Sequence, residues 1–254
     1  MNWNVLIADL LAVMLGAART GAWMMLAPPF SARNIPGTVK ALLSIGLTLP
    51  MLPYLRGSVP SLETWDIIAC AVLQVFVGAG LGFITGLLFA ALQAAGDMLD
   101  LFGGFTLSMA YDPMSQNQSS VFGRFYNLIA MTILFATNGH LLILHGFLKS
   151  FQTLPLNASF NLATFGQLLI KGVGEMFLAA LQIAGPLVVV LFLTDVAFGL
   201  LNRVAPALNA FQLGFPAKIF LLLVLSGIAV TTLPAVIETL VERSVAAVLK
   251  LTGG

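Results

Sequence analysis

Residues 67–96 read IIACAVLQVFVGAGLGFITGLLFAALQAAG, a stretch that carries no charged side chain between Asp66 and Asp97. A helix of roughly 20 apolar residues crosses a hydrocarbon core about 30 Å thick, so this block is long enough to span a membrane. It also places a small residue at every fourth position, at Gly78, Gly82, Gly86, Ala90 and Ala94. Small residues at this spacing let helix backbones approach closely. We therefore predict that this helix packs tightly against another helix, in this chain or in a partner subunit.

The composition of the whole chain is that of a membrane protein. Of its 254 residues, 59% are hydrophobic and 8% are charged, whereas soluble domains carry about 25% charged residues. The formal net charge of +1 provides no basic surface for nucleic acid. A single cysteine, Cys70, supplies neither a disulfide framework nor a Cys-based metal site. Asp9 and Arg19 interrupt the first apolar run, so we expect no cleaved signal peptide.

Charge-free windows predict an all-α, membrane-associated fold. Four windows are long enough to be spanning helices: 66–97, 124–149, 175–195 and 218–238. Two further windows, 9–33 and 40–56, are shorter or carry charge, so hydropathy predicts about six spans in total. Prolines lie inside or beside several of these runs, which indicates kinked and broken helical hairpins. The polar stretch 151–165 is the candidate boundary between two parts of the chain.

Residues 102–122, FGGFTLSMAYDPMSQNQSSVF, separate two apolar blocks and mix glycines and polar amides with large apolar side chains. Irregular backbone at membrane depth is tolerated only where protein buries it or where it lines a water-filled cavity. We interpret the stretch as a buried, mobile element near a conduit. Its candidate gate residues are Phe102, Gly103, Gly104, Phe105, Met109, Tyr111, Met114 and Phe122. From the residues alone, anchoring of a re-entrant turn explains the aromatic side chains equally well.

Acidic residues inside apolar blocks are candidate functional groups, because charge is costly there. Asp97 and Asp100 are three residues apart and share a helix face, so together they could form a proton site. We favour the alternative, in which they cap or end the helix near water. For Asp195 and for Arg203 we favour helix packing or subunit contact over a proton relay. The sequence contains no motif of a hydrolase, a metalloprotease or a nucleotide-binding loop, so we expect neither an enzyme nor a cofactor.

Short motifs follow one another in a fixed order from Arg19 to about Lys218. The first half contains Ala27-Pro28, Ile35-Pro36, Ala95-Gly96-Asp97, Gly103-Gly104-Phe105 and Asp112-Pro113. The second half contains Phe135, Asn138-Gly139-His140, Ser150-Phe151, Leu154-Pro155, Asp195, Gly199-Leu200, Arg203, Pro206, Phe211 and Gly214-Phe215-Pro216. No single motif is specific, but the ordered set resembles the FliR family of flagellar biosynthesis proteins.

This resemblance implies a subunit of the export gate of the flagellar type III secretion system, in the bacterial inner membrane at the flagellar basal body. Family members are similar to a P-like part fused to a Q-like part, which would be residues 1–165 and 166–254 here. They assemble with the P and Q gate proteins into a funnel, and the B switch protein is a further expected partner. Unfolded protein chains pass through the funnel. The resemblance places residues 102–122 inside it as a plug.

Two other functions stay open from the sequence. An R-type subunit of a virulence injectisome would share the fold and the gate role. An independent, proton-coupled secondary transporter would use Asp97, Asp100 or Asp195 as its proton site. Such transporters are commonly built from inverted repeats, and the sequence shows no convincing internal repeat.

Overall fold

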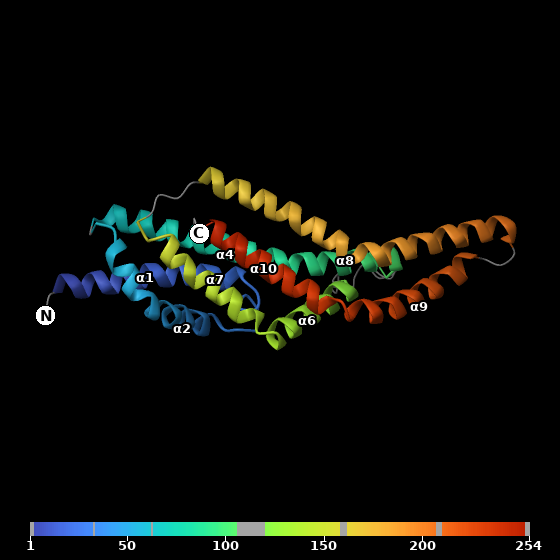
Figure 1. Ribbon diagram of the computed structural model, residues 1–254, viewed down its shortest axis with the longest axis horizontal. Helices are drawn as coiled ribbons and strands as arrows, with labels where there is room; N and C mark the ends of the chain where they lie inside the picture. Colours follow the sequence, from blue (N-terminus) through green and yellow to red (C-terminus); the bar gives the residue numbers. More distant parts are fainter. Residues whose placement is uncertain are drawn as a thin grey trace. The chain divides into compact units, whose positions relative to one another are not determined.

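The computed structural model describes residues 3–32, 34–61, 63–105, 120–157, 162–206 and 210–251. These residues are mostly helical and contain no β-strand, which confirms the predicted all-α fold (Figure 1). The chain divides into two compact units. The first consists of Met1–Leu88, Asn138–Val173 and Leu240–Gly254, and the second of Phe89–Thr137 and Gly174–Thr239.

Figure 1 labels the longer helices in chain order. Before the gap at residues 106–119 they are α1 (Trp3–Leu26), α2 (Gly37–Thr48), α3 (Leu52–Leu55) and α4 (Thr64–Gly103), with short 3₁₀ turns at Leu49–Met51 and Arg56–Ser58. After the gap they are α6 (Val121–Ala136), α7 (Gly139–Thr153), α8 (Leu162–Val204), α9 (Ala210–Val230) and α10 (Leu233–Leu251). Three of them, α4, α8 and α10, contribute residues to both units.

Five helical stretches in the described residues are long and apolar enough to cross a membrane: Leu6–Leu26, Gly37–Ser58, Thr64–Gly103, Phe165–Val204 and Gln212–Val230. A sixth span is obtained only if α6 and α7 are counted together. The charge-free window 124–149 predicts a spanning helix there, and the structure has instead two helices, α6 and α7, which meet at a bend of 78° and pass as a span only together. At the bend Asn138 has a φ of 57°. A residue in this left-handed conformation ends an α-helix.

Most prolines in the described residues lie at or near helix ends. Pro50 and Pro53 occupy the first positions of short helical turns, and Pro36 precedes α2. The amide that proline lacks has no intrahelical acceptor at a helix start, so proline is tolerated there. Pro186 and Pro216 instead lie inside α8 and α9, where each removes a backbone hydrogen bond.

In the first unit, two glycines of the small-residue series bring α4 against the backbone of α1. A Cβ atom at Gly78 would overlap the carbonyl oxygen of Arg19. At Gly82 it would lie 2.8 Å from the carbonyl oxygen of Trp23. At Gly86 a Cβ atom would make only ordinary van der Waals contacts, so the closest approach lies at the first two positions.

Arg19 is fully buried in the same unit and is bound by neutral groups. Its Nε donates to Oε1 of Gln74 at 2.6 Å, and its terminal nitrogens donate to the carbonyl oxygens of Ser150 at 3.2 Å and Leu154 at 2.9 Å. Its guanidinium carbon lies 4.6 Å from the ring centroid of Phe151. These carbonyl groups lie at the C-terminal end of α7, where helices carry partial negative charge. The guanidinium therefore joins α1, α4 and the end of α7.

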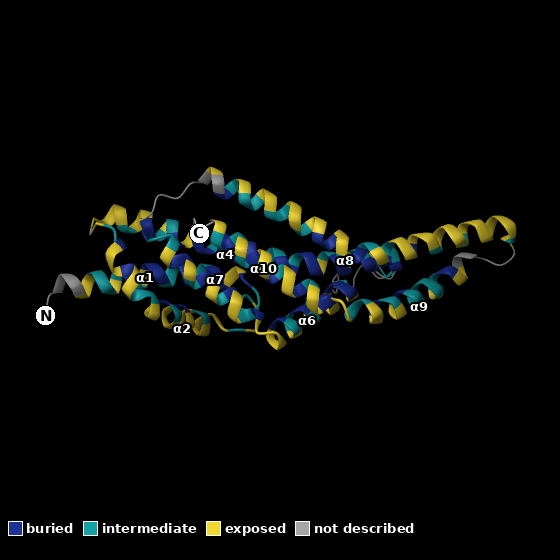
Figure 2. Ribbon diagram, in the orientation of Figure 1, coloured by how far each residue is buried: buried dark blue, intermediate teal, exposed yellow. Residues whose placement is uncertain are grey.

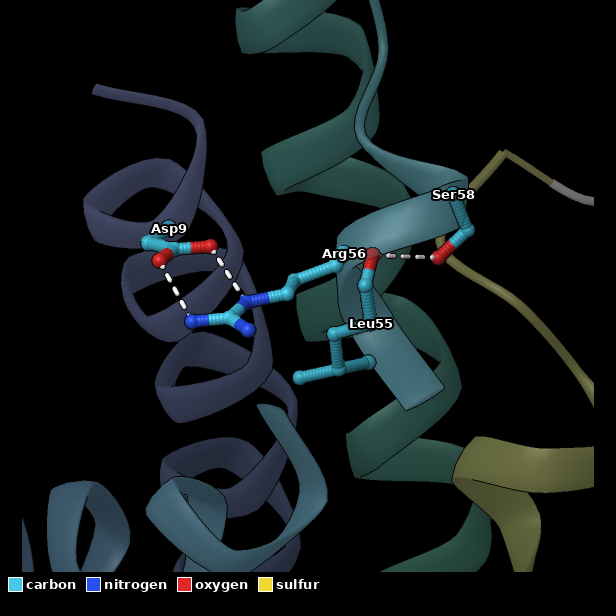
Figure 3. Close-up of polar contacts among 4 residues, drawn as sticks. All are labelled: Asp9, Leu55, Arg56 and Ser58. Carbon is cyan, nitrogen blue, oxygen red and sulfur yellow. Dashed lines mark hydrogen bonds and ion pairs between the residues drawn. The ribbon is translucent and has the colours of Figure 1, made fainter. Parts of the chain in front are cut away.

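An ion pair at the surface of the first unit ties the stretch after α2 to α1 (Figure 3). The Arg56 guanidinium donates to both carboxylate oxygens of Asp9 at 2.7 Å. Beside it, the hydroxyl of Ser58 donates to the carbonyl oxygen of Leu55 at 2.9 Å, which closes the turn. Leu55 itself is fully buried. The polar contacts thus lie next to a buried apolar side chain, that of Leu55.

We expect Gly78→Ala to destabilise the protein by about 1–3 kcal/mol, the usual cost of overpacking, because the new methyl group meets rigid backbone. The matched control is Gly46→Ala in α2, where a Cβ atom would meet nothing within 4 Å. Alanine is favoured over glycine in a helix by about 1 kcal/mol, so the control should be at least as stable as the wild type. Thermal unfolding in detergent measures both, and equal stability of the two variants would contradict the close approach.

Candidate functional site

The second unit holds both ends of residues 102–122, which we call the gate segment. Three of its predicted residues lie outside the described part of the chain: Met109, Tyr111 and Met114. The described ends lie close together, since the ring centroids of Phe105 and Phe122 are 5.6 Å apart in an edge-on arrangement. The last described residue before residues 106–119 is therefore in side-chain contact with a residue that follows them closely.

The first end of the segment, which we call the leaving end, is the C-terminus of α4, and a glycine terminates this helix. The backbone N–H of Phe105 donates to the carbonyl oxygen of Asp100 at 3.0 Å, and Gly104 has a φ of 86°. This pattern is a Schellman motif, in which a left-handed residue follows the helix and the next N–H bonds back to its last turn. Glycine adopts that conformation without steric cost. The sequence Gly103-Gly104-Phe therefore ends α4 at this point.

The two glycines also bring the leaving end against α9. A Cβ atom at Gly103 would overlap a methyl group of Leu222, and its distance from Cγ of the same leucine would be 3.8 Å. A Cβ atom at Gly104 would lie 2.7 Å from the ring of Phe215. Phe102 is half-buried beside them, and both glycines are buried. We call the contact of Gly103 and Gly104 with Phe215 and Leu222 the glycine seat.

The returning end is the N-terminus of α6. Ser120 is its N-cap, and the serine Oγ accepts from the backbone N–H of Gly123 at 2.7 Å. The carboxylate of Asp100, on α4, accepts from the N–H of Phe122, with its two oxygens at 3.1 and 3.3 Å. The first amides of a helix lack intrahelical acceptors and favour negative charge nearby. Asp100 is 2% exposed, so it acts as a buried cap that joins α6 to α4.

Two glycines outside the predicted four-residue series let α4 and α6 approach each other closely at this junction. A Cβ atom at Gly96 would lie 2.5 Å from the backbone of Phe122 and Gly123. One at Gly123 would collide with the carboxylate of Asp97, a residue that is itself exposed. The sequence interpretation used Gly96 only as part of a family motif, since it falls outside the four-residue spacing. The sequence signal available for this close contact was the position of Gly96 next to Asp97.

The remaining acidic candidate, Asp195, forms an ion pair with Lys218. The lysine Nζ lies 2.7 and 2.9 Å from the two carboxylate oxygens, and it links α9 to α8. The Asp195 side chain is 50% exposed and that of Lys218 is 14% exposed. Sequence interpretation included Lys218 only as a family marker. No group of three or more His, Cys, Asp or Glu residues within the described ranges is arranged to hold a metal ion.

Gly86 lies in the first unit, and the remaining predicted packing residues lie on helices of the second unit. Ala90 and Ala94 are half-buried on α4, and Arg203 is exposed in the last turn of α8. The structure thus separates the predicted set into three places. Gly78 and Gly82 contact α1 in the first unit, the gate-segment ends meet at Asp100, and Asp195 belongs to the α8–α9 pair.

Comparison with known proteins identifies the family. A family model described as bacterial export proteins, family 1, matches residues 10–244. The flagellar biosynthetic protein FliR of Bacillus subtilis (strain 168) is 32% identical over 212 residues, which are 82% of each chain. This chain belongs to the FliR family. FliR of Escherichia coli (strain K12) is 32% identical over 78% of this chain and 76% of its own.

A third relative, FliR of Pectobacterium carotovorum subsp. carotovorum, is 30% identical over 84% of this chain and 82% of its own. The family resemblance predicted from the ordered motifs is therefore confirmed. Membership places this FliR-family chain among the bacterial export proteins of flagellar biosynthesis. Together with its long apolar helices, it indicates a membrane-embedded component of a protein assembly.

We expect Asp100→Ala to loosen the first turn of α6, because the buried Phe122 N–H loses its acceptor, at a cost of about 1–3 kcal/mol. Hydrogen exchange at the amides of Phe122 and Gly123, measured by mass spectrometry, should accelerate. Asp100→Asn keeps one acceptor oxygen of the same size, so it should show a smaller effect. Equal exchange in both variants and in the wild type would exclude this role of the carboxylate.

Proposed function

We propose that this FliR-family chain is a subunit of the flagellar type III export gate in the bacterial inner membrane, at the basal body, and that its gate segment is a plug. The observation that carries the proposal is the attachment of both ends of the segment to Asp100. The carbonyl oxygen of that residue accepts from Phe105, and its carboxylate accepts from Phe122. A segment that is anchored at both ends keeps the same position in the assembly even when its interior changes conformation.

The composition of the segment suits a seal. Apolar constrictions stop ions by excluding water from a pore. Methionine side chains are unbranched and deformable, so Met109 and Met114 could close around the varied side chains of a passing, unfolded protein. The described aromatic rings, Phe105 and Phe122, lie against each other at the base of the segment. They would hold the base while the interior moves aside.

The proposed partners are the P and Q gate proteins and the B switch protein, with residues 1–165 as the P-like part and 166–254 as the Q-like part. Helix faces in the second unit support assembly with other helices. Glycines 185 and 199 of α8 have nothing within 4 Å of a Cβ position, so a foreign backbone could approach there. Much of α9 is exposed and apolar, including Leu213, Phe220, Leu223, Val224 and Ile228 (Figure 2).

The alternatives have less support. The relatives named above are all flagellar, which favours the flagellum over a virulence injectisome. For a proton-coupled transporter, Asp100 and Asp195 are the two paired candidates. The first accepts from a backbone amide and the second binds Lys218. Both carboxylates therefore have structural partners, which favours the gate.

Assembly is tested by co-expressing the full chain with its cognate P and Q proteins and analysing the extracted complex by native mass spectrometry. The proposal predicts one copy of this chain together with several P and Q copies. A stable monomer or dimer that forms no complex with these proteins would contradict it.

The plug is tested by replacing residues 106–119 with a short Gly-Ser linker, which the closeness of Phe105 and Phe122 permits. We expect the complex to assemble normally and the membrane to become leaky to ions, because the apolar seal is lost while both anchors stay. Conductance of the purified complex in planar bilayers measures the leak. Removal of residues 252–254 is the control and should conduct like the wild type. An assembled linker variant with wild-type conductance would rule out the plug.

A further inference from the structure

Arg19 is fully buried in the first unit, and no acidic residue in the described part of the chain forms an ion pair with it. Burying a charge without a counter-charge is costly, and the proposed gate function gives this residue no role. We propose that Arg19 is a positioning residue, which holds the chain that follows α7 and so fixes where α8 begins on α4. The inference rests on the proposed function, and it adds a residue on which the correct presentation of α8 to partner subunits depends.

The hydrogen bonds of Arg19 hold the end of α7 and the residues that follow it. Its two terminal nitrogens donate to the carbonyl oxygens of Ser150 and Leu154 at 3.2 and 2.9 Å. Its Nε donates to Oε1 of Gln74 at 2.6 Å, and Nε2 of Gln74 donates to the carbonyl oxygen of Leu156 at 3.1 Å. Leu156 is itself fully buried. Side chains of α1 and α4 therefore bind three backbone carbonyl groups between residues 150 and 156.

The first turns of α8 pack against α4 a short distance further along the chain. Phe165 is buried, and a Cβ atom at Gly80 would overlap its ring. The ring centroids of Phe76 and Phe165 are 5.0 Å apart. A Cβ atom at Gly172 would lie 2.8 Å from a methyl group of Leu87. Gly80 and Leu87 are seven residues apart, as are Phe165 and Gly172, so the two helices run here in the same direction with matched spacing.

The polar contacts specify this pairing better than the apolar contacts do. Both helices are almost entirely apolar here, and apolar attraction has no preferred direction. In coiled coils a buried polar group selects one register among several, at a cost in stability. The hydrogen bonds of Arg19 and Gln74 fix the chain at Leu156, nine residues before Phe165. They therefore disfavour pairings in which α8 is shifted along α4.

The start of α8 determines which of its faces meets a partner subunit. α8 is one helix from Leu162 to Val204, and successive residues of a helix are rotated by about 100°. A shift of one residue at the start would therefore turn Gly185 and Gly199, whose Cβ positions are open, away from a partner helix. Through α8, Arg19 influences assembly without contacting a partner itself.

The combined change Arg19→Met and Gln74→Met tests this in the full chain. Two of the three carbonyl oxygens keep another donor, the N–H of Leu154 at 2.9 Å and the Sγ of Cys70 at 3.3 Å, so we expect the variant to remain folded. The start of α8 should lose its single position on α4. The yield of the complex with the cognate P and Q proteins, measured by native mass spectrometry, should fall several-fold.

The position of α8 is measured without any partner by electron paramagnetic resonance. Spin labels are attached at Gly57→Cys and Gln167→Cys, two exposed positions of the first unit. Cys70→Ser removes the native thiol and keeps a donor for the carbonyl oxygen of Leu156. We expect one narrow distance distribution in this background and a broadened or shifted distribution when the two methionines are added. An unchanged distribution would overturn the inference.

The matched control is Thr48→Val, which removes a buried hydroxyl that bonds to that of Thr20 at 3.0 Å in the same unit. It should keep both the distance distribution and the yield of the complex, and an equal loss in this control would overturn the inference. If the double variant does not fold, Arg19→Lys supplies the measurement. Lysine keeps the charge but lacks the planar fork of donors, so the distribution should still broaden, and an unchanged one would count against Arg19.

The two measurements separate this inference from the proposed function. Failure of the wild-type chain to assemble with the P and Q proteins would contradict the proposed function. The distance measurement needs no partner, so it tests the role of Arg19 by itself. A normal yield of complex from a variant with a displaced α8 would overturn the inference, because the position of α8 would then not matter for assembly.

Discussion

The candidate site depends on one residue, Asp100, which accepts hydrogen bonds from two backbone amides. The carbonyl oxygen of Asp100 receives the N–H of Phe105, and its carboxylate receives the N–H of Phe122. These bonds bring the two ends of the gate segment to the same turn of α4. The entropy cost of closing a flexible loop grows only slowly with its length. The anchor therefore fixes where the segment begins and ends.

Glycine lets α4 approach its neighbours at successive points. Within the first unit, Gly78 meets the backbone of α1, and within the second unit Gly96 meets α6 and Gly103 meets α9. In a lipid environment helices gain little hydrophobic energy from contacting each other, so packing depends on close van der Waals contact. A helix with many small residues can make such contacts with several partners. The sequence of α4 therefore determines much of the packing in each unit.

The sequence predicted what depends on local pattern. The four-residue spacing of Gly78 and Gly82 predicted a close helix contact, and the charge-free windows predicted an all-α protein with long apolar helices. It did not predict the cap on α6, because a carboxylate that binds a backbone amide 22 residues away leaves no pattern in the side chains. The sequence analysis missed the bend at Asn138 because hydropathy carries no information about backbone conformation, although Asn-Gly is a turn signal. Lys218 finds its partner only through the antiparallel pairing of α8 and α9.

Different kinds of contact hold the second unit together around the described ends of residues 102–122. The carboxylate of Asp100 is buried and hydrogen-bonded, so breaking its bond exposes an unsatisfied amide. The Asp195–Lys218 pair joins two helices through charge. At the glycine seat, the described contacts between the first end of the segment and α9 are apolar. The two ends of the segment are therefore held by different interactions, a buried hydrogen-bonded carboxylate at one and close packing of glycine against apolar side chains at the other.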